Sequence, residues 1–136
     1  MKHKGCTLEF AEQRNRELLR AFKKEIAESE RIDTMKIAYK IVDTKCSRFW
    51  VSEERALSVI AKIFKGEDIL KSMRGTKREM FLEIYRRVAD LRKSHPKASL
   101  TSLIAKVINA PAPKFYMKPR CAMEIIYKIR KPLRKQ

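Results

Sequence analysis

The fold is decided by residues 35–63, MKIAYKIVDTKCSRFWVSEERALSVIAKI, because a second stretch of the chain aligns with them without a gap. That stretch is residues 101–129, TSLIAKVINAPAPKFYMKPRCAMEIIYKI, and the alignment needs a shift of 66 residues. Identical pairs include Lys40 with Lys106 and Phe49 with Phe115. The non-helical middle of the stretch matches as well as its ends, which favours an internal duplication over a chance likeness of amphipathic helices.

Each copy is expected to form three helices, because apolar residues recur at helical spacing. The first helix is expected over residues 14–29 in the first copy. In the second copy it is expected to begin at Thr76, in a capping box completed by Glu79. It is expected to end at His95 and Pro96, since the residue before a proline avoids the helical conformation.

The second helix is expected to begin at Asp33 in the first copy and at Ser99 in the second, because both are good N-cap residues. Extended stretches are expected to follow over residues 44–51 and 110–117. Ser52 then provides the N-cap of the third helix.

Proline and glycine mark the ends of the third helix. Pro119 stands at the first helical position, which favours proline, and Gly66 stands where a glycine ends a helix. The predicted fold is therefore all-α, with two tandem copies of a three-helix unit and a short extended segment before the last helix of each. The predicted domains are residues 1–66, a linking helix in 67–75, residues 76–132 and a basic tail at 133–136. Residues 48–51 and 114–117 are alternatively expected to pair as short strands about a pseudo-two-fold axis.

The charge indicates the class of partner. The chain has 33 Lys and Arg against 16 Asp and Glu, a net charge of +17. A soluble small domain needs a net charge of about two to eight, so the excess predicts a polyanionic partner. Nucleic acid is the commonest such partner, because neutralising its phosphates releases condensed counterions.

Other classes of protein are disfavoured. No apolar run approaches the roughly 18 residues of a membrane span. Three scattered cysteines fit a reducing compartment, so we expect a cytoplasmic protein, associated with the nucleoid if it is cellular. The two histidines and three cysteines lack zinc-site spacing, and no catalytic motif is present. We expect no enzymatic activity, no metal, no cofactor and no small-molecule substrate.

Two short helices leading into a third, on a strongly basic chain, resemble the helix-turn-helix DNA-binding unit. The resemblance covers each copy from its second helix onward and implies that the third helix enters the major groove. The connection before the third helix, residues 44–51, is longer here than the three or four residues usual in that family.

The resemblance implies that the outward face of each third helix carries recognition. These residues are Ser52, Arg55, Ser58 and Lys62 in the first copy, and Lys118, Arg120, Glu124 and Lys128 in the second. Arg48 and Lys114, just before the third helices, would bind phosphates that fix the register. Lys62 with Lys128, and Arg48 with Lys114, are the strongest candidates because both copies keep a positive charge there. The alternative is that an exposed helix face is basic only because it is solvated.

Two further features have two interpretations each. Aromatic residues beside the phosphate candidates either stack on unpaired bases or pack in the core. Phe49 and Phe115 are predicted to be core residues, whereas both interpretations stay open for Trp50 and Tyr116. The basic C-terminal segment either follows a phosphate backbone or is a solvated end. Its candidate residues are Arg130, Lys131, Arg134 and Lys135.

The predicted function is non-enzymatic binding of double-stranded DNA in a regulatory, packaging or mobile-element accessory role. A monomer with internal pseudo-symmetry is expected, with a dimer as the alternative. One rival function is RNA binding or association with ribosomes. The other is a structural or adaptor protein with an acidic protein partner, for example in a phage particle.

Overall fold

The computed structural model describes the backbone of residues 2–135 and the side chains of residues 10–130. The described chain is all-helical, as predicted, and contains no β-strand, so the expected strand pairing of residues 48–51 with 114–117 is wrong. The helices are α1 (Lys2–Glu28), α2 (Thr34–Val42), α3 (Glu53–Phe64), the 3-10 helix η1 (Ile69–Ser72), α4 (Gly75–Ser94), α5 (Leu100–Ile108) and α6 (Pro119–Lys135).

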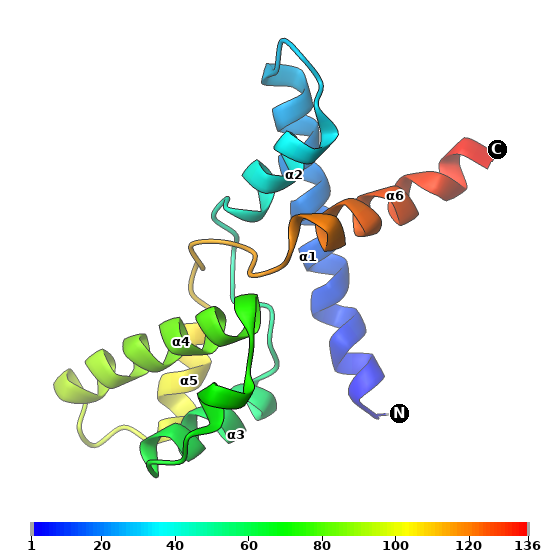
Figure 1. The fold of residues 1–136 in the computed structure, drawn as a ribbon. Helices are drawn as coiled ribbons and strands as arrows, with labels where there is room; N and C mark the ends of the chain where they lie inside the picture. Colours follow the sequence, from blue (N-terminus) through cyan, green and yellow to red (C-terminus); the bar gives the residue numbers. More distant parts are fainter. Residues whose placement is uncertain (1, 136) are drawn as a thin grey trace. The chain divides into compact units, whose positions relative to one another are not determined.

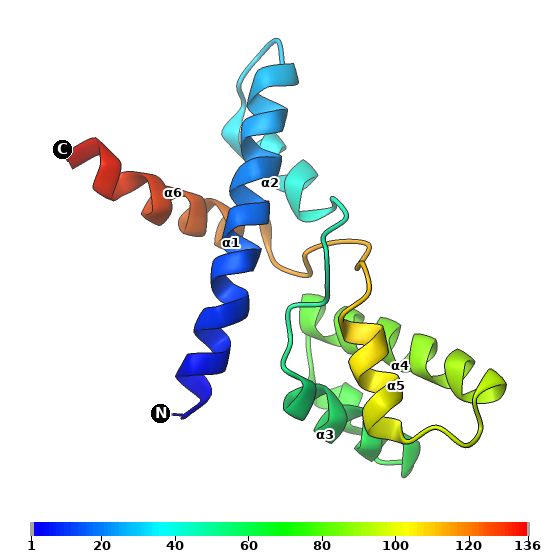
Figure 2. The same ribbon diagram turned by 180° about the vertical axis from the view of Figure 1, so that it is seen from behind.

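The chain folds into two compact units (Figures 1 and 2). Unit 1 consists of Met1–Cys46 and Pro113–Gln136, and therefore holds α1, α2 and α6. Unit 2 is the continuous segment Ser47–Ala112, with α3, η1, α4 and α5. Each unit thus combines the first two helices of one sequence copy with the third helix of the other.

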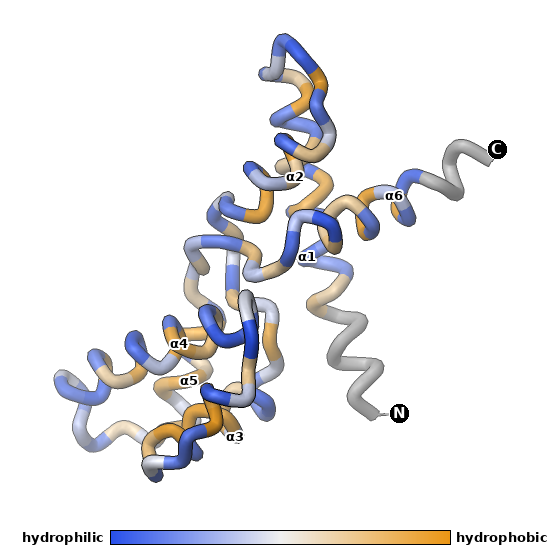
Figure 3. Tube along the Cα trace, viewed as in Figure 1, coloured by the Kyte–Doolittle hydropathy of each residue, from blue (hydrophilic) through white to orange (hydrophobic). Residues whose placement is uncertain are grey.

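The core of unit 2 lies where α3, α4 and α5 contact one another. Val59 and Ile60 of α3 and Ile84 and Val88 of α4 are fully buried. Apolar and polar residues alternate along these helices with the helical period (Figure 3). Burial of large aliphatic side chains, at about 25 cal/mol per Å² of apolar surface, is the main stabilising contribution.

The core of unit 1 is built in the same way from α1, α2 and α6, each of which contacts the other two. Leu18 of α1, Ile41 of α2, and Ala122 and Ile126 of α6 are buried. The third helix of the second copy therefore covers the first two helices of the first copy.

The extended segments before α3 and α6 are held by one equivalent hydrogen bond in each unit. The backbone N–H of Phe49 donates to the carbonyl of Ile108 at 2.9 Å, and that of Phe115 donates to the carbonyl of Val42, also at 2.9 Å. Both carbonyls belong to the last residue of a helix, where no intrahelical donor exists. The Phe49 and Phe115 rings are buried, which confirms their prediction as core residues. These backbone donors bond to helix ends, which is why they form no ladder of strands.

The predicted helix ends are mostly confirmed. The side chains of Asp33, Ser52 and Ser99 each accept a hydrogen bond from the backbone N–H three residues later. Pro119 is the first residue of α6. Gly66, with φ of +87°, follows the last turn of α3 in the left-handed conformation that favours glycine.

Two predicted starts of first helices are wrong. The helix α1 begins at Lys2 instead of residue 14, because residues 6–13 contain neither proline nor glycine to interrupt it. The helix α4 begins at Gly75, where φ is +52°, and its N-cap is Arg74. Thr76 therefore lies inside the helix and does not open a capping box with Glu79.

The division into units predicts how fragments behave. A fragment of residues 47–112 contains every helix of unit 2, so we expect a monomer with a cooperative thermal transition by circular dichroism. A fragment of residues 1–66 lacks α6, leaves the core faces of α1 and α2 uncovered, and is expected to be unfolded or to associate. A monomeric, cooperatively folding fragment 1–66 would instead support the predicted tandem domains.

Candidate nucleic-acid interface

The helix α3 separates a core face from a solvent face. Val59 and Ile60 point inward with no exposed surface, whereas Arg55, Ser58 and Lys62 are exposed. The three exposed residues lie at spacings of three and four, and so share one side of the helix. All three are exposed as predicted, although the guanidinium carbon of Arg55 lies 5.9 Å from the centre of the buried Phe81 ring of α4.

The helix α6 repeats this arrangement in unit 1. Ala122 and Ile126 point inward, and Arg120, Glu124 and Lys128 are exposed. Lys118, just before the helix, is also exposed. The candidate residues of the two copies therefore do not meet in a single unit. Those of the first copy lie on one basic helix face in unit 2, and those of the second copy lie on another in unit 1.

Lys62 and Lys128, which align in the two copies, are available to bind an anion. Among the side chains of residues 10–130, neither forms an ion pair. The guanidinium groups of Arg86 and Arg87, by contrast, are held by Glu83 at 2.6 and 2.8 Å. Charges that are already paired gain less from a phosphate, so Lys62 and Lys128 are better suited to bind one than Arg86 and Arg87.

The first turns of the two third helices differ in charge. In α3 the first turn contains Glu53 and Glu54, which suit the positive end of the helix dipole but repel phosphate. The first turn of α6 contains no acid, and Lys118 and Arg120 flank its start. A helix N-terminus with basic neighbours attracts phosphate, so α6 is the more favourable of the two for phosphate.

Arg48 braces the segment before α3. Its Nε donates to the carbonyl of Phe49 at 2.9 Å, and one terminal nitrogen donates to the carbonyl of Val51 at 2.7 Å. Burial lowers the pKa of Arg48, and the charge of Glu53 opposes this effect. Part of the guanidinium thus serves the fold.

The equivalent segment before α6 has a different local structure. The ammonium nitrogen of Lys114 lies 5.7 Å from the centre of the Tyr116 ring, a cation–π distance. Tyr116 has φ of +56°, which is costly for a bulky residue. Trp50 and Tyr116 are both half-buried, so base stacking stays a prediction for these two side chains.

The C-terminal candidates are only partly described. The exposed Arg130 places its guanidinium carbon 5.8 Å from the centre of the Phe22 ring. The side chains of Lys131, Arg134 and Lys135 lie outside the described residues, and their predicted contact with a phosphate backbone stays a prediction.

Sequence reasoning missed an apolar groove in unit 1. It has a volume of about 870 Å³ and lies between α1 and α6. Ile32 and Tyr127, two of its lining residues, are 65% and 68% exposed. Their signal in the sequence is weak, because both lie outside the apolar stripes that mark the helix cores.

The comparisons give no family for this chain. Searches against known protein families, curated proteins and solved structures found no match. Within the described residues, no three His, Cys, Asp or Glu side chains group as metal ligands. In that same part of the chain, no helix has the length and apolarity needed to cross a membrane.

The pairing of Glu83 predicts a pH dependence of stability. Burial alone raises the pKa of Glu83, but the hydrogen bonds and charges of Arg86 and Arg87 outweigh burial and lower the pKa below its ordinary value. A lowered folded-state pKa means that the ionised carboxylate stabilises the fold above the unfolded-state pKa. This contribution is lost as the pH falls through the folded-state pKa.

We therefore expect Glu83→Gln to lower the free energy of unfolding by about 1 kcal/mol at pH 7. The difference should shrink towards pH 3, as measured by urea denaturation. Glu67→Gln, at an exposed residue of the same unit, is the control and should change stability little at either pH. An equal effect of both substitutions would contradict the role given to Glu83.

Proposed function

We propose that this chain binds double-stranded DNA without enzymatic activity, by neutralising phosphates and presenting two related helices, α3 and α6, to the groove. The observation that carries the proposal is the exposed lysine at the same position of both helices, Lys62 and Lys128, neither of which is in an ion pair with a side chain of residues 10–130. We further propose that the two sequence copies arose by duplication and that the chain acts as a monomer. A cytoplasmic location fits this function, with association with the nucleoid if the protein is cellular.

The charge of each unit supports a polyanionic ligand. Unit 1 contains 19 Lys and Arg against 9 Asp and Glu, a net charge of +10. Unit 2 contains 14 against 7, a net charge of +7. Both halves of the fold therefore have the excess of cations that a phosphate backbone neutralises. A single basic tail would leave one unit close to neutral.

Equivalent contacts support the duplication. The Phe49 hydrogen bond in unit 2 and the Phe115 hydrogen bond in unit 1 join residues that match under the same shift of 66. Two copies of a reading helix in one chain would replace the dimer that other helix-turn-helix proteins use to read two half-sites. Regulation, packaging and mobile-element accessory roles all fit such a reader.

RNA binding is the main alternative, since the same cations can follow A-form RNA. The test is a fluorescence-anisotropy titration of the full chain with labelled duplex DNA, single-stranded DNA and duplex RNA, each over a series of salt concentrations. We expect duplex DNA to bind most tightly, with log affinity falling against log salt at a slope that implies about six to ten phosphate contacts. Tighter binding of duplex RNA would favour the RNA alternative. Equal, weak binding of all three would favour an adaptor with an acidic protein partner.

Charge reversal at the two equivalent lysines tests the helix faces. We expect Lys62→Glu with Lys128→Glu to weaken duplex DNA binding by at least about tenfold and to reduce the salt slope by about two. The control is Lys24→Glu with Lys77→Glu, which makes the same charge change at exposed lysines of α1 and α4, one in each unit. If both double variants weaken binding equally, only the net charge matters and the assignment of α3 and α6 is wrong.

The different first turns predict a gain of affinity. Glu54 of α3 aligns with Arg120 of α6. Glu54→Arg should therefore make the first turn of α3 resemble that of α6, strengthen duplex binding severalfold, and steepen the salt slope by about one. Glu67→Arg, beyond the C-terminal end of α3, makes the same charge change and should have a smaller effect. A larger effect of Glu67→Arg would contradict the groove-facing position of this helix end.

A further inference from the structure

The apolar groove of unit 1 has a filled counterpart in unit 2. Its walls are α1 and α6, and the helices at equivalent positions in unit 2 are α4 and α3. The groove residues Leu19 and Arg130 align with Tyr85 and Phe64 of unit 2. Those two rings pack together there, with centres 5.1 Å apart. In unit 1 the same two positions line an open groove.

A segment of the chain also covers the filled counterpart. After α3 ends at Gly66, the 3-10 helix η1 contacts both α3 and α4. Met73, directly after η1, is buried, and Ile69 and Leu70 are half-buried. In unit 1, α6 continues as a helix to Lys135, past the position that aligns with Gly66, so residues 131–135 do not form the turn that follows α3. The groove is therefore open where unit 2 has an apolar cover.

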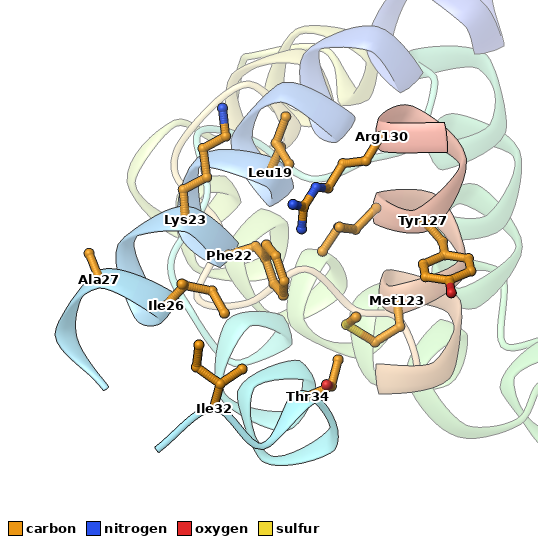
Figure 4. Close-up of a pocket in the computed structure, with 11 residues that line it drawn as sticks. Leu19, Phe22, Lys23, Ile26, Ala27, Ile32, Thr34, Met123, Tyr127 and Arg130 are labelled. Atoms are coloured by element: carbon orange, nitrogen blue, oxygen red, sulfur yellow. The ribbon is translucent and has the colours of Figure 1, made fainter. Parts of the chain in front are cut away.

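The rim of the groove is cationic. Figure 4 shows the guanidinium of Arg130 reaching from α6 towards Leu19 and Phe22 of α1. Lys23 contributes a second positive charge from α1. None of the described residues that line this groove is acidic. An occupant with apolar side chains and negative charge is complementary to such a surface.

A second copy of this chain does not match these charges. A symmetric contact brings the same patch of each copy together, and would place Lys23 and Arg130 of both copies at one interface. Unit 1 as a whole has a net charge of +10. Like charges at close range oppose such a contact, so the groove suits a different protein.

We propose that the groove between α1 and α6 docks a short acidic amphipathic segment of a partner protein. Two or three apolar side chains of this segment fill the space beside Leu19, Phe22 and Ile26. Its carboxylates meet Lys23 and Arg130. The segment takes the place in unit 1 that η1 and Met73 take in unit 2. This role differs from DNA binding because it uses an apolar surface that phosphates cannot fill, although Arg130 is also a predicted phosphate contact.

The probe is a peptide with the sequence of residues 66–73, GEDILKSM, which contains the unit 2 cover. It is titrated into the ¹⁵N-labelled full chain, and amide shifts are recorded by NMR. We expect shifts centred on residues 19–34 and 123–130, and tighter binding when the peptide carries Lys71→Glu. A peptide with Ile69, Leu70 and Met73 replaced by serine should bind at least about tenfold more weakly.

Matched variants of the protein locate the site. We expect Ile32→Ser with Tyr127→Ser to weaken peptide binding about tenfold. Met35→Ser with Tyr39→Ser is the control, since these large side chains of unit 1 are also exposed but do not line the groove. All four side chains are exposed, so both double variants should keep the thermal midpoint of the wild type.

Several outcomes would overturn the proposal. Absence of peptide binding, equal weakening by both double variants, or indifference to the peptide charge would each do so. Tighter binding of dodecanoate than of the peptide at the same residues would show that the groove takes a fatty amphiphile. A dimer in sedimentation analysis that is lost in Ile32→Ser with Tyr127→Ser would show that a second copy occupies the groove.

Discussion

The hydrogen bond from the N–H of Phe49 to the last carbonyl of α5, with its equivalent from Phe115 to α2, anchors the segment through which each third helix joins the other two helices of its unit. It occurs because the connection over residues 44–51 is long. Eight residues could span at most about 26 Å if fully extended, which leaves room for the third helix to leave the second helix of its own copy. A turn of three or four residues would hold the two together. In unit 2, Arg87 strengthens this anchor, since its guanidinium lies 5.0 Å from the centre of the Phe49 ring and donates to the carbonyl of Pro111 at 2.9 Å.

The sequence is sufficient to predict where most helices begin and end, because those signals are local. A serine or aspartate at an N-cap, or a glycine after a last turn, acts on hydrogen bonds within four residues. The exchange of third helices has no such local signal. The inward residues of α3 and α6, such as Ile60 and Ile126, are nearly the same in both copies. Either helix could therefore pack on either pair of partners, and the choice follows from the path of the connection.

The same distinction explains what could be predicted at the candidate interface. The exposure of Lys62 and Lys128 follows from helical periodicity once Ile60 and Ile126 are placed inward. The contacts of Arg48 depend on the conformation of an irregular segment, where no period indicates which way a side chain points. Its guanidinium donates to two nearby carbonyls. The presence of a basic residue before a helix does not by itself predict these hydrogen bonds.

The two copies keep the third-helix lysines but differ at the peripheral groove. Lys62 and Lys128 retain the same residue type, whereas Phe64 and Tyr85 of unit 2 align with Arg130 and Leu19 of unit 1. Each unit of a duplicated fold needs a well-packed core, but it does not need a filled peripheral groove. Each fully buried aliphatic or aromatic side chain adds only about 1.5–3 kcal/mol to the free energy of unfolding. Unit 2 closes its groove with its own chain, and its core is complete without a partner. Unit 1 keeps an equivalent groove open beside the cations Lys23 and Arg130. An open apolar surface with positive charge at its edge suits an acidic amphipathic segment better than it suits nucleic acid.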